Sequence, residues 1–248
     1  MKVVVIGGTG LIGSKVVQML TTHGHEAVAA SLQTGVDTLT GEGVAYVLAG
    51  ADVVVDVTNS PSFADDDVMA FFTTSTGTLL AAEKNAGVRH HVALSIVGTD
   101  SLPDSGYLRA KLAQEQLIRE SGVGYSIVRA TQFFEFTTAI ADSSMVDGVL
   151  RLSPAHYQPM ASDDVASAVA RAALAAPLNG VKEIGGPERV RMSEFIPAAL
   201  AAAGDTRELV VDEHATYFGT ELGDDSLVPG PDAELGSTTY EAWAKEPA

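Results

Sequence analysis

A glycine-rich turn between a strand-like and a helix-like segment constrains this chain more than any other feature. The apolar run Val3-Val4-Val5-Ile6 predicts a buried strand, and residues 14–21 are typical of a helix. Between them lies Gly7-Gly8-Thr9-Gly10-Leu11-Ile12-Gly13. Glycines at 7, 10 and 13 permit a tight turn, close approach of a pyrophosphate and close helix–strand packing. The helix N-terminus adds free N–H groups and partial positive charge, so the segment predicts a dinucleotide-binding turn.

Composition narrows the class of protein further. The chain has 248 residues, of which 46% are hydrophobic, so we expect one domain with a well-buried core. A net charge of −17 argues against nucleic acid and anionic membranes as partners. There is no cysteine, which excludes disulfides and thiol nucleophiles. Met1-Lys2 leads directly into the first strand, so we expect no signal peptide and cytoplasmic residence.

Metal binding is not expected. The acidic runs at 65–67, 163–164 and 224–225 are typical of helix N-termini or solvated faces. The six histidines show no ligand spacing, so none is assigned to a metal.

Strand-like and helix-like segments alternate along the first three-quarters of the chain. We expect strands at 2–6, 25–30, 52–58, 91–95, 125–129 and 181–184, and helices at 41–50, 65–86, 106–120, 163–176 and 193–203. This rhythm predicts an α/β fold with a doubly wound parallel sheet of Rossmann type. The whole chain, 1–248, is expected to form one domain, in which residues from about 135 onward contribute a small C-terminal substrate lobe.

A second motif suggests proton-transfer chemistry. Tyr107 and Lys111 are four residues apart and share one face of a predicted helix. Ser95 stands at the end of a predicted strand, where ligands of open parallel sheets bind. A nearby ammonium group and a helix N-terminus favour a phenolate, so we expect a lowered pKa at Tyr107. Ser95 would hold the substrate oxygen, and Lys111 would also bond a ribose hydroxyl.

These motifs resemble the short-chain dehydrogenase/reductase superfamily, in its atypical NmrA-like branch. The resemblance covers nearly the whole chain. Its residues are the glycine turn, the segments 51–56, 87–92 and 94–95, Tyr107-x-x-x-Lys111 and 125–133. It implies an NAD(P)-dependent oxidoreductase acting on a small carbonyl, quinone or activated double bond.

The resemblance also implies positions for the site residues. Ser95, Tyr107 and Lys111 occupy the family's catalytic Ser-Tyr-Lys positions. The cofactor would contact residues of the glycine turn, the ends of three further strands and the helical lysine: Gly7, Thr9, Gly10, Leu11, Ile12, Gly13, Ser31, Thr58, Asn59, Lys111, Ala130, Thr131 and Phe133.

One departure keeps other functions open. The superfamily's catalytic Asn on the long helix has no counterpart, since no Asn lies between Asn59 and Asn85. The alternatives are a non-catalytic dinucleotide-sensing regulator, as known in this branch, and an NAD-dependent epimerase or isomerase.

The choice of cofactor depends on the end of the second strand. NAD-specific Rossmann domains usually place an acid there. Here Ala30-Ser31 occupies the position and the next acid is Asp37. This favours NADP(H), with NAD(H) left open. No Lys or Arg lies between Lys15 and Lys84, so Lys15 is the candidate cation for a 2′-phosphate.

Overall fold

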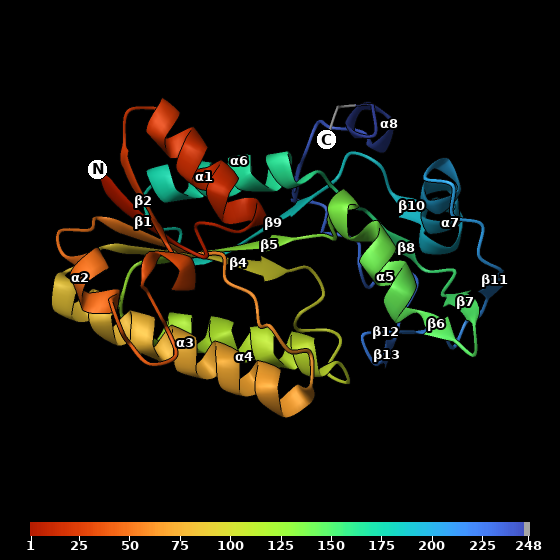
Figure 1. The fold of residues 1–248 in the computed structure, drawn as a ribbon, viewed down its shortest axis with the longest axis horizontal. Helices are drawn as coiled ribbons and strands as arrows, with labels where there is room; N and C mark the ends of the chain where they lie inside the picture. Colours follow the sequence, from red (N-terminus) through yellow and green to blue (C-terminus); the bar gives the residue numbers. More distant parts are fainter. Residues whose placement is uncertain (246–248) are drawn as a thin grey trace.

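The computed structural model describes residues 1–245, and one parallel sheet organises it (Figure 1). In spatial order its seven strands are β14 (Glu234–Leu235), β9 (Gly180–Gly185), β5 (Tyr125–Ala130), β4 (His90–Ile96), β3 (Val53–Asp56), β1 (Lys2–Ile6) and β2 (Glu26–Ala30). Every pairing in this sheet is parallel. The strand order reverses beside β1, which is the arrangement of a doubly wound fold.

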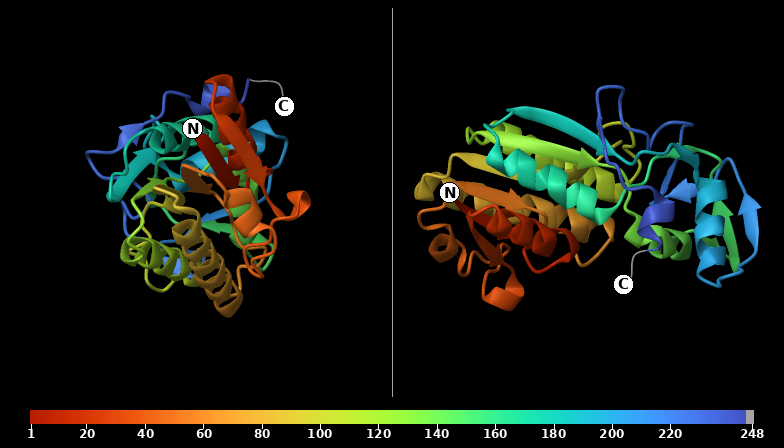
Figure 2. Two further views of the ribbon diagram at one scale, coloured as in Figure 1. Left: turned by 90° about the vertical axis from the view of Figure 1, so that its left-hand side faces the viewer. Right: turned by 90° about the horizontal axis from the view of Figure 1, so that it is seen from above.

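Helices cover both faces of the sheet. One face carries α1 (Leu11–Thr22) and α6 (Ser162–Leu174), and the other carries α3 (Asp65–Ala86), α4 (Gly106–Glu120) and the short α2 (Val44–Leu48) (Figures 1 and 2). The first turn of α3 holds Asp65, Asp66 and Asp67, and that of α6 holds Asp163 and Asp164. These acids complement the partial positive charge of a helix N-terminus, as predicted. Gly87, with φ of +72°, ends α3 as its C-cap.

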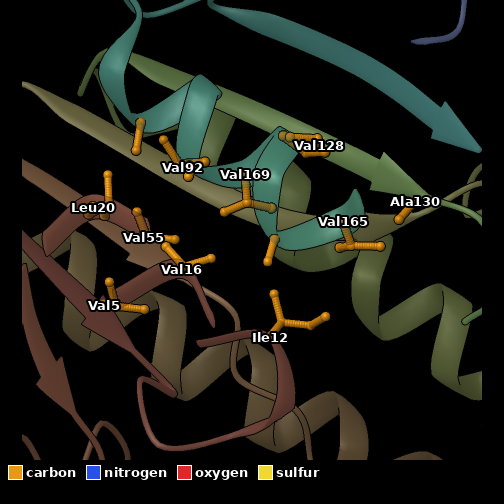
Figure 3. Packing of buried hydrophobic residues seen from close by; sticks show 14 of the residues in the cluster. Val5, Ile12, Val16, Leu20, Val55, Val92, Val128, Ala130, Val165 and Val169 are labelled. Atoms are coloured by element: carbon orange, nitrogen blue, oxygen red, sulfur yellow. The ribbon is translucent and has the colours of Figure 1, made fainter. Parts of the chain in front are cut away.

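Alternation along the strands divides the core into two layers. Val3 and Val5 face α1 and α6, where they meet Val16, Leu20 and Val169 (Figure 3). Val4 and Ile6 face the opposite side, against α2 and Leu79 of α3. Because both faces are covered, the central strands read as continuous apolar runs.

A smaller lobe lies beyond the carboxyl ends of the main strands (Figure 2). Its helices are α5 (Thr137–Ser143), α7 (Met192–Ala202) and α8 (Tyr240–Trp243). Its strands are β6 (Met145–Val146), β7 (Val149–Leu152), β8 (His156–Tyr157), β10 (Val190–Arg191), β11 (Leu209–Val211), β12 (Thr216–Tyr217) and β13 (Thr220–Glu221). Two 3-10 turns, at Leu32–Thr34 and Phe134–Phe136, complete the elements.

The predicted α/β fold and parallel sheet are confirmed. The sequence did not indicate the two-residue strands of the lobe or the contribution of β14 to the main sheet. The helix expected at 193–203 begins one residue earlier, at Met192. Among residues 1–245, no helix combines the length and the apolar character that crossing a membrane requires.

Candidate functional site

The glycine turn connects β1 to α1 and is hydrogen-bonded to the end of β2. Its first two N–H groups, from Gly7 and Gly8, both donate to Ala30 O at the end of β2, at 2.9 and 3.2 Å. Gly7 has φ of +80°. A Cβ at Gly13 would lie 2.1 Å from Gly7 O, so only glycine fits there. The backbone geometry therefore explains two of the three predicted glycines.

The N-terminus of α1 suits an anion. Gly10 is its N-cap, no side chain caps it, and no acid lies in its first turn. Thr9, Gly10 and Leu11 are exposed, whereas Ile12 is buried in the core. A Cβ on Gly10 would meet only Gly7 O, at 3.3 Å. This open, uncapped helix end offers backbone donors to a pyrophosphate.

The end of β2 carries a hydroxyl and no acid. The Ser31 Oγ atom is buried, and it faces the Thr34 N–H in a capping box without making a hydrogen bond of normal geometry. The carboxylate of Asp37 is engaged locally, since it accepts from Leu39 N at 2.8 Å. Lys15, the candidate cation for a 2′-phosphate, instead pairs with Asp163 at 2.7 Å. Ser31 is therefore the polar side chain best placed at this position.

The loop after β3 joins the glycine turn to the tyrosine. A Cβ on Gly7 would lie 3.1 Å from Val57 O and 3.2 Å from Thr58 N, so the two loops touch. The Thr58 N–H and hydroxyl donate to Asp56 Oδ1 at 3.0 and 2.7 Å. Next in sequence, Asn59 Oδ1 accepts the Tyr107 hydroxyl at 2.8 Å. Residues 57–59 thus contact both the glycine turn and Tyr107.

Lys111 is held by a buried hydrogen-bonded chain. Its Nζ donates to Leu94 O at 2.8 Å and to Gln114 Oε1. Gln114 Nε2 in turn donates to Asp56 Oδ2 at 3.0 Å. Burial lowers the pKa of Lys111 to about 8, against the opposing effect of Asp56. An ammonium has three donors, so one N–H has no oxygen acceptor among the described residues, although Nζ also lies over the Phe72 ring.

Tyr107 does not have the lowered pKa that the sequence suggested. Burial raises the pKa of its phenol, and the neighbouring Tyr217 adds to the rise. The Lys111 ammonium turns toward Leu94 and the face of the Phe72 ring, 4.4 Å from its centroid. The expectation is wrong because desolvation outweighs the opposing effect of the hydrogen bond to Asn59 on the pKa. The phenol is therefore protonated at neutral pH, which is the form of a general acid.

Ser95 lies in a buried ion network. Its hydroxyl donates to Glu115 Oε1 at 2.6 Å, and only 2% of the residue is exposed. Glu115 also pairs with Arg129 at 2.8 Å, and Arg129 pairs with Asp100 at 2.8 Å. Ser95 follows Leu94 on the strand and faces α4. Its hydroxyl is committed to Glu115, so the structure does not bring it to Tyr107 as a substrate ligand.

The segment after β5 combines buried and partly buried residues. Ala130 and Thr131 are buried, and the Thr131 hydroxyl donates to Gln158 O at 2.6 Å. Phe133 is partly buried and stacks on Phe136 with 5.5 Å between ring centroids. Gln132 is 7% exposed, and its amide lies beside the Tyr217 hydroxyl without making a hydrogen bond of normal geometry.

Sequence reasoning missed two contacts of this site. It placed Asn59 beside the cofactor and searched for a catalytic Asn only on the long helix, but Asn59 bonds the tyrosine directly. It also missed Gln114, which stands three residues after Lys111, a spacing that puts both on one helix face.

A cluster in the lobe has the composition of a metal site but not its charge balance. His156, Asp224 and Asp225 come within ligand distance of one another. Arg191 and Arg189 pair with Asp224 and Asp225, respectively. These cations already neutralise the carboxylates, so we assign no metal to the cluster.

Known proteins resemble this chain in sequence and in fold. A family model described as NAD(P)H-binding matches residues 7–176. The (4-alkanoyl-5-oxo-2,5-dihydrofuran-3-yl)methyl phosphate reductase of Streptomyces griseus is 30% identical over 162 residues, which are 60% of this chain and 54% of that protein. The match thus spans about half the length of that relative. An NAD(P)H azoreductase of Xenophilus azovorans is 28% identical over 227 residues, covering 82% of this chain and 74% of the relative.

Solved structures match the fold. The UDP-glucose 4-epimerase of Thermus thermophilus, in complex with NAD, superposes with a TM-score of 0.70 at 20% identity. The match covers 92% of both chains, so the small lobe is included in the shared architecture.

Proposed function

Because the chain belongs to the NAD(P)H-binding family, we propose that it is an oxidoreductase that transfers a hydride between a nicotinamide cofactor and a small substrate. The substrate would be a carbonyl compound, a quinone or an activated double bond. The Rossmann fold and the resemblance to the short-chain dehydrogenase/reductase superfamily are confirmed. The reductases of Streptomyces griseus and Xenophilus azovorans support the reaction class.

One observation carries this proposal. The loop at 57–59 touches the glycine turn at Gly7, and Asn59 in this loop accepts a hydrogen bond from the Tyr107 hydroxyl. A dinucleotide held at α1 and a proton donor on α4 would therefore share one loop. The carboxyl ends of parallel strands are the usual ligand site of such a fold.

The chain's residues suit the cofactor. The glycine turn and the uncapped α1 would hold the pyrophosphate, and the Ser31 hydroxyl would face the adenosine ribose. Thr58, Asn59, Ala130, Thr131 and Phe133 would border the remainder, Thr131 through its backbone because its hydroxyl is engaged. The bound nicotinamide supplies the hydride.

Tyr107 and Lys111 would divide the proton chemistry and the binding. Protonated Tyr107 would donate its proton to the substrate oxygen, exchanging Asn59 for that oxygen as acceptor. Lys111, fixed by Leu94 and Gln114, would keep one N–H for a ribose hydroxyl. We leave Ser95 out of the catalytic set, because Glu115 holds its hydroxyl.

We also propose that NADP(H) binds at least as well as NAD(H). No acid follows β2 until Asp37, whose carboxylate caps Leu39 N. A 2′-phosphate would therefore meet the Ser31 hydroxyl rather than a repelling carboxylate. Cytoplasmic residence and a small-molecule partner remain part of this proposal.

The test is consumption of NADPH with a panel of quinones, enones and aldehydes. Tyr107→Phe should lower kcat by roughly 10²–10⁴-fold with little change in cofactor affinity. Lys111→Met should lower activity and also weaken cofactor binding. The double variant should lose less than the product of the two effects, because the residues act together.

A non-catalytic sensor is the rival function. The specific observation in its favour is that the hydroxyls of Ser95 and Tyr107 are both engaged within the protein. Tight binding of cofactor with no turnover across the panel would establish the sensor. Full turnover by Tyr107→Phe would assign proton donation to another group.

A further inference from the structure

Three aromatic rings from distant segments meet at the proposed proton donor. Phe63 follows β3, Tyr107 lies on α4, and Phe218 stands between β12 and β13 in the lobe. The Tyr107 centroid lies 5.3 Å from that of Phe63 and 6.0 Å from that of Phe218, and the last two are 5.8 Å apart. Phe63 is 52% exposed. We call these three residues the aromatic cluster.

The backbone holds Phe218 in an unfavourable conformation at this place. Tyr217 pairs with Thr220, so Phe218 and Gly219 form a two-residue hairpin turn. Both have positive φ, +46° and +83°. Asn, Asp or Gly normally occupies the first position of such a turn, and a bulky residue there is strained. Strained backbone conformations are common at functional sites, and here the strained turn places the Phe218 ring against Tyr107.

A buried amide beside the aromatic cluster lacks partners. Tyr217 packs edge-on against Phe218 at 4.8 Å. Burial raises the pKa of Tyr217, and the neighbouring Gln132 amide opposes the rise. Neither side-chain atom of Gln132 makes a hydrogen bond of normal geometry. Buried amides are nearly always satisfied, so an orphaned one at the end of β5 points to a ligand.

We propose that the aromatic cluster and Gln132 select a flat, conjugated ring carbonyl as substrate. The rings of Phe63 and Phe218 would pack against the compound, and Tyr107 would bond its carbonyl oxygen. Gln132 bonds a second polar atom of the ring. This inference rests on the proposed function, since it names the substrate class of the same site.

The cluster does not suit a phosphorylated sugar. Arg109, two residues after Tyr107, is already bound by Asp65 at 2.6 Å and by Pro103 O at 2.7 Å. Stacked or tilted aromatic pairs instead stabilise planar conjugated rings.

Binding without turnover tests the proposal. Calorimetry with 1,4-naphthoquinone is carried out in excess NADP⁺, which carries no hydride. The chain has no cysteine, so the quinone forms no thiol adduct. Phe218→Leu and Gln132→Leu should each weaken quinone binding roughly three- to tenfold, as expected from one aromatic contact or hydrogen bond. Their affinity for NADP⁺ should not change.

Two controls make the result specific. Phe195→Leu removes a ring that stacks within the lobe on Phe134, and it should bind the quinone as wild type does. Wild type should bind 2-octanone, a flexible ketone, far more weakly than naphthoquinone. Equal binding of the two compounds, or wild-type quinone affinity in Phe218→Leu and Gln132→Leu, overturns the proposal.

The two proposals fail separately. Quinone binding that depends on Phe218, without NADPH consumption, supports the ring site and contradicts the oxidoreductase. Turnover of aliphatic carbonyls alone, with no quinone binding, supports the oxidoreductase and overturns the ring site.

Discussion

Removal of the Ser95 hydroxyl would distinguish a catalytic role of this residue from a structural one. It bonds the fully buried carboxylate of Glu115, so Ser95→Ala leaves a charged acceptor with one partner fewer. We expect the free energy of unfolding to fall by about 1–3 kcal/mol. The value of kcat/KM should change by less than about twofold.

Urea unfolding and steady-state kinetics check this expectation. Ser62→Ala is the matched control, because its hydroxyl also bonds a carboxylate, that of Asp67, but at an exposed site. Its stability should change by less than about 0.5 kcal/mol. A large loss of kcat in Ser95→Ala, with stability unchanged, would restore the catalytic role.

Ser31 is the residue at which cofactor preference can be altered. Ser31→Asp introduces a carboxylate that accepts from a ribose 2′-hydroxyl and repels a 2′-phosphate. The ratio of the Kd for NADPH to that for NADH should rise by about tenfold or more, equivalent to about 1.4 kcal/mol. Fluorescence titration with both cofactors measures it. A wild-type protein that already binds NADH tenfold more tightly would contradict our interpretation of β2.

Among the elements, the turn between β1 and α1 should separate binding from folding. At Gly10 an added Cβ meets only Gly7 O at 3.3 Å, so Gly10→Val should fold. Its larger side chain would occupy the space of the pyrophosphate and abolish cofactor binding. Gly77→Val, on the exposed face of α3 with no atom near its Cβ, is the control. Unchanged affinity in a folded Gly10→Val protein would exclude this turn as the site.

The main elements could be predicted from the sequence because burial on both sides gives strands such as 53–56 a continuous apolar run. The short strands of the lobe could not, because elements such as β12 and β13 have two residues each and no periodicity. Within the site, spacing predicted that Tyr107 and Lys111 share a helix. It did not predict that Asn59, 48 residues earlier, bonds the phenol, since that contact depends on the path of a loop. Nor could it show that Glu115 holds Ser95.

For the molecule as a whole, a buried pair beneath the sheet links stability to pH. His91 Nδ1 lies 2.7 Å from Glu83 Oε1, and both side chains are fully buried. Burial would lower the pKa of His91, but Glu83 outweighs burial and raises it above 6.5. A raised histidine pKa contributes stability that is complete below about pH 6.5 and is lost as pH rises through the folded value.

Glu83→Gln tests this linkage. The difference in free energy of unfolding between wild type and variant should be largest near pH 6 and shrink toward about pH 9. His90, whose pKa burial lowers to about 4, acts with the opposite sign but is present in both proteins. Glu120→Gln, which removes an exposed carboxylate at the end of α4, is the control variant. A difference for Glu83→Gln that does not change between about pH 6 and about pH 9 would contradict the pairing.

The edge strand β14 has a consequence for the order in which the nascent chain is completed. It pairs with β9, although 48 residues separate Gly185 from Glu234. Until residue 235 has left the ribosome, the outer backbone groups of β9 have no strand to bond, and an open edge recruits other chains. The segment between β9 and β14 is therefore synthesised while the outer edge of β9 has no paired strand. We expect a chain truncated before residue 234 to aggregate more readily than the full chain, as light scattering would measure.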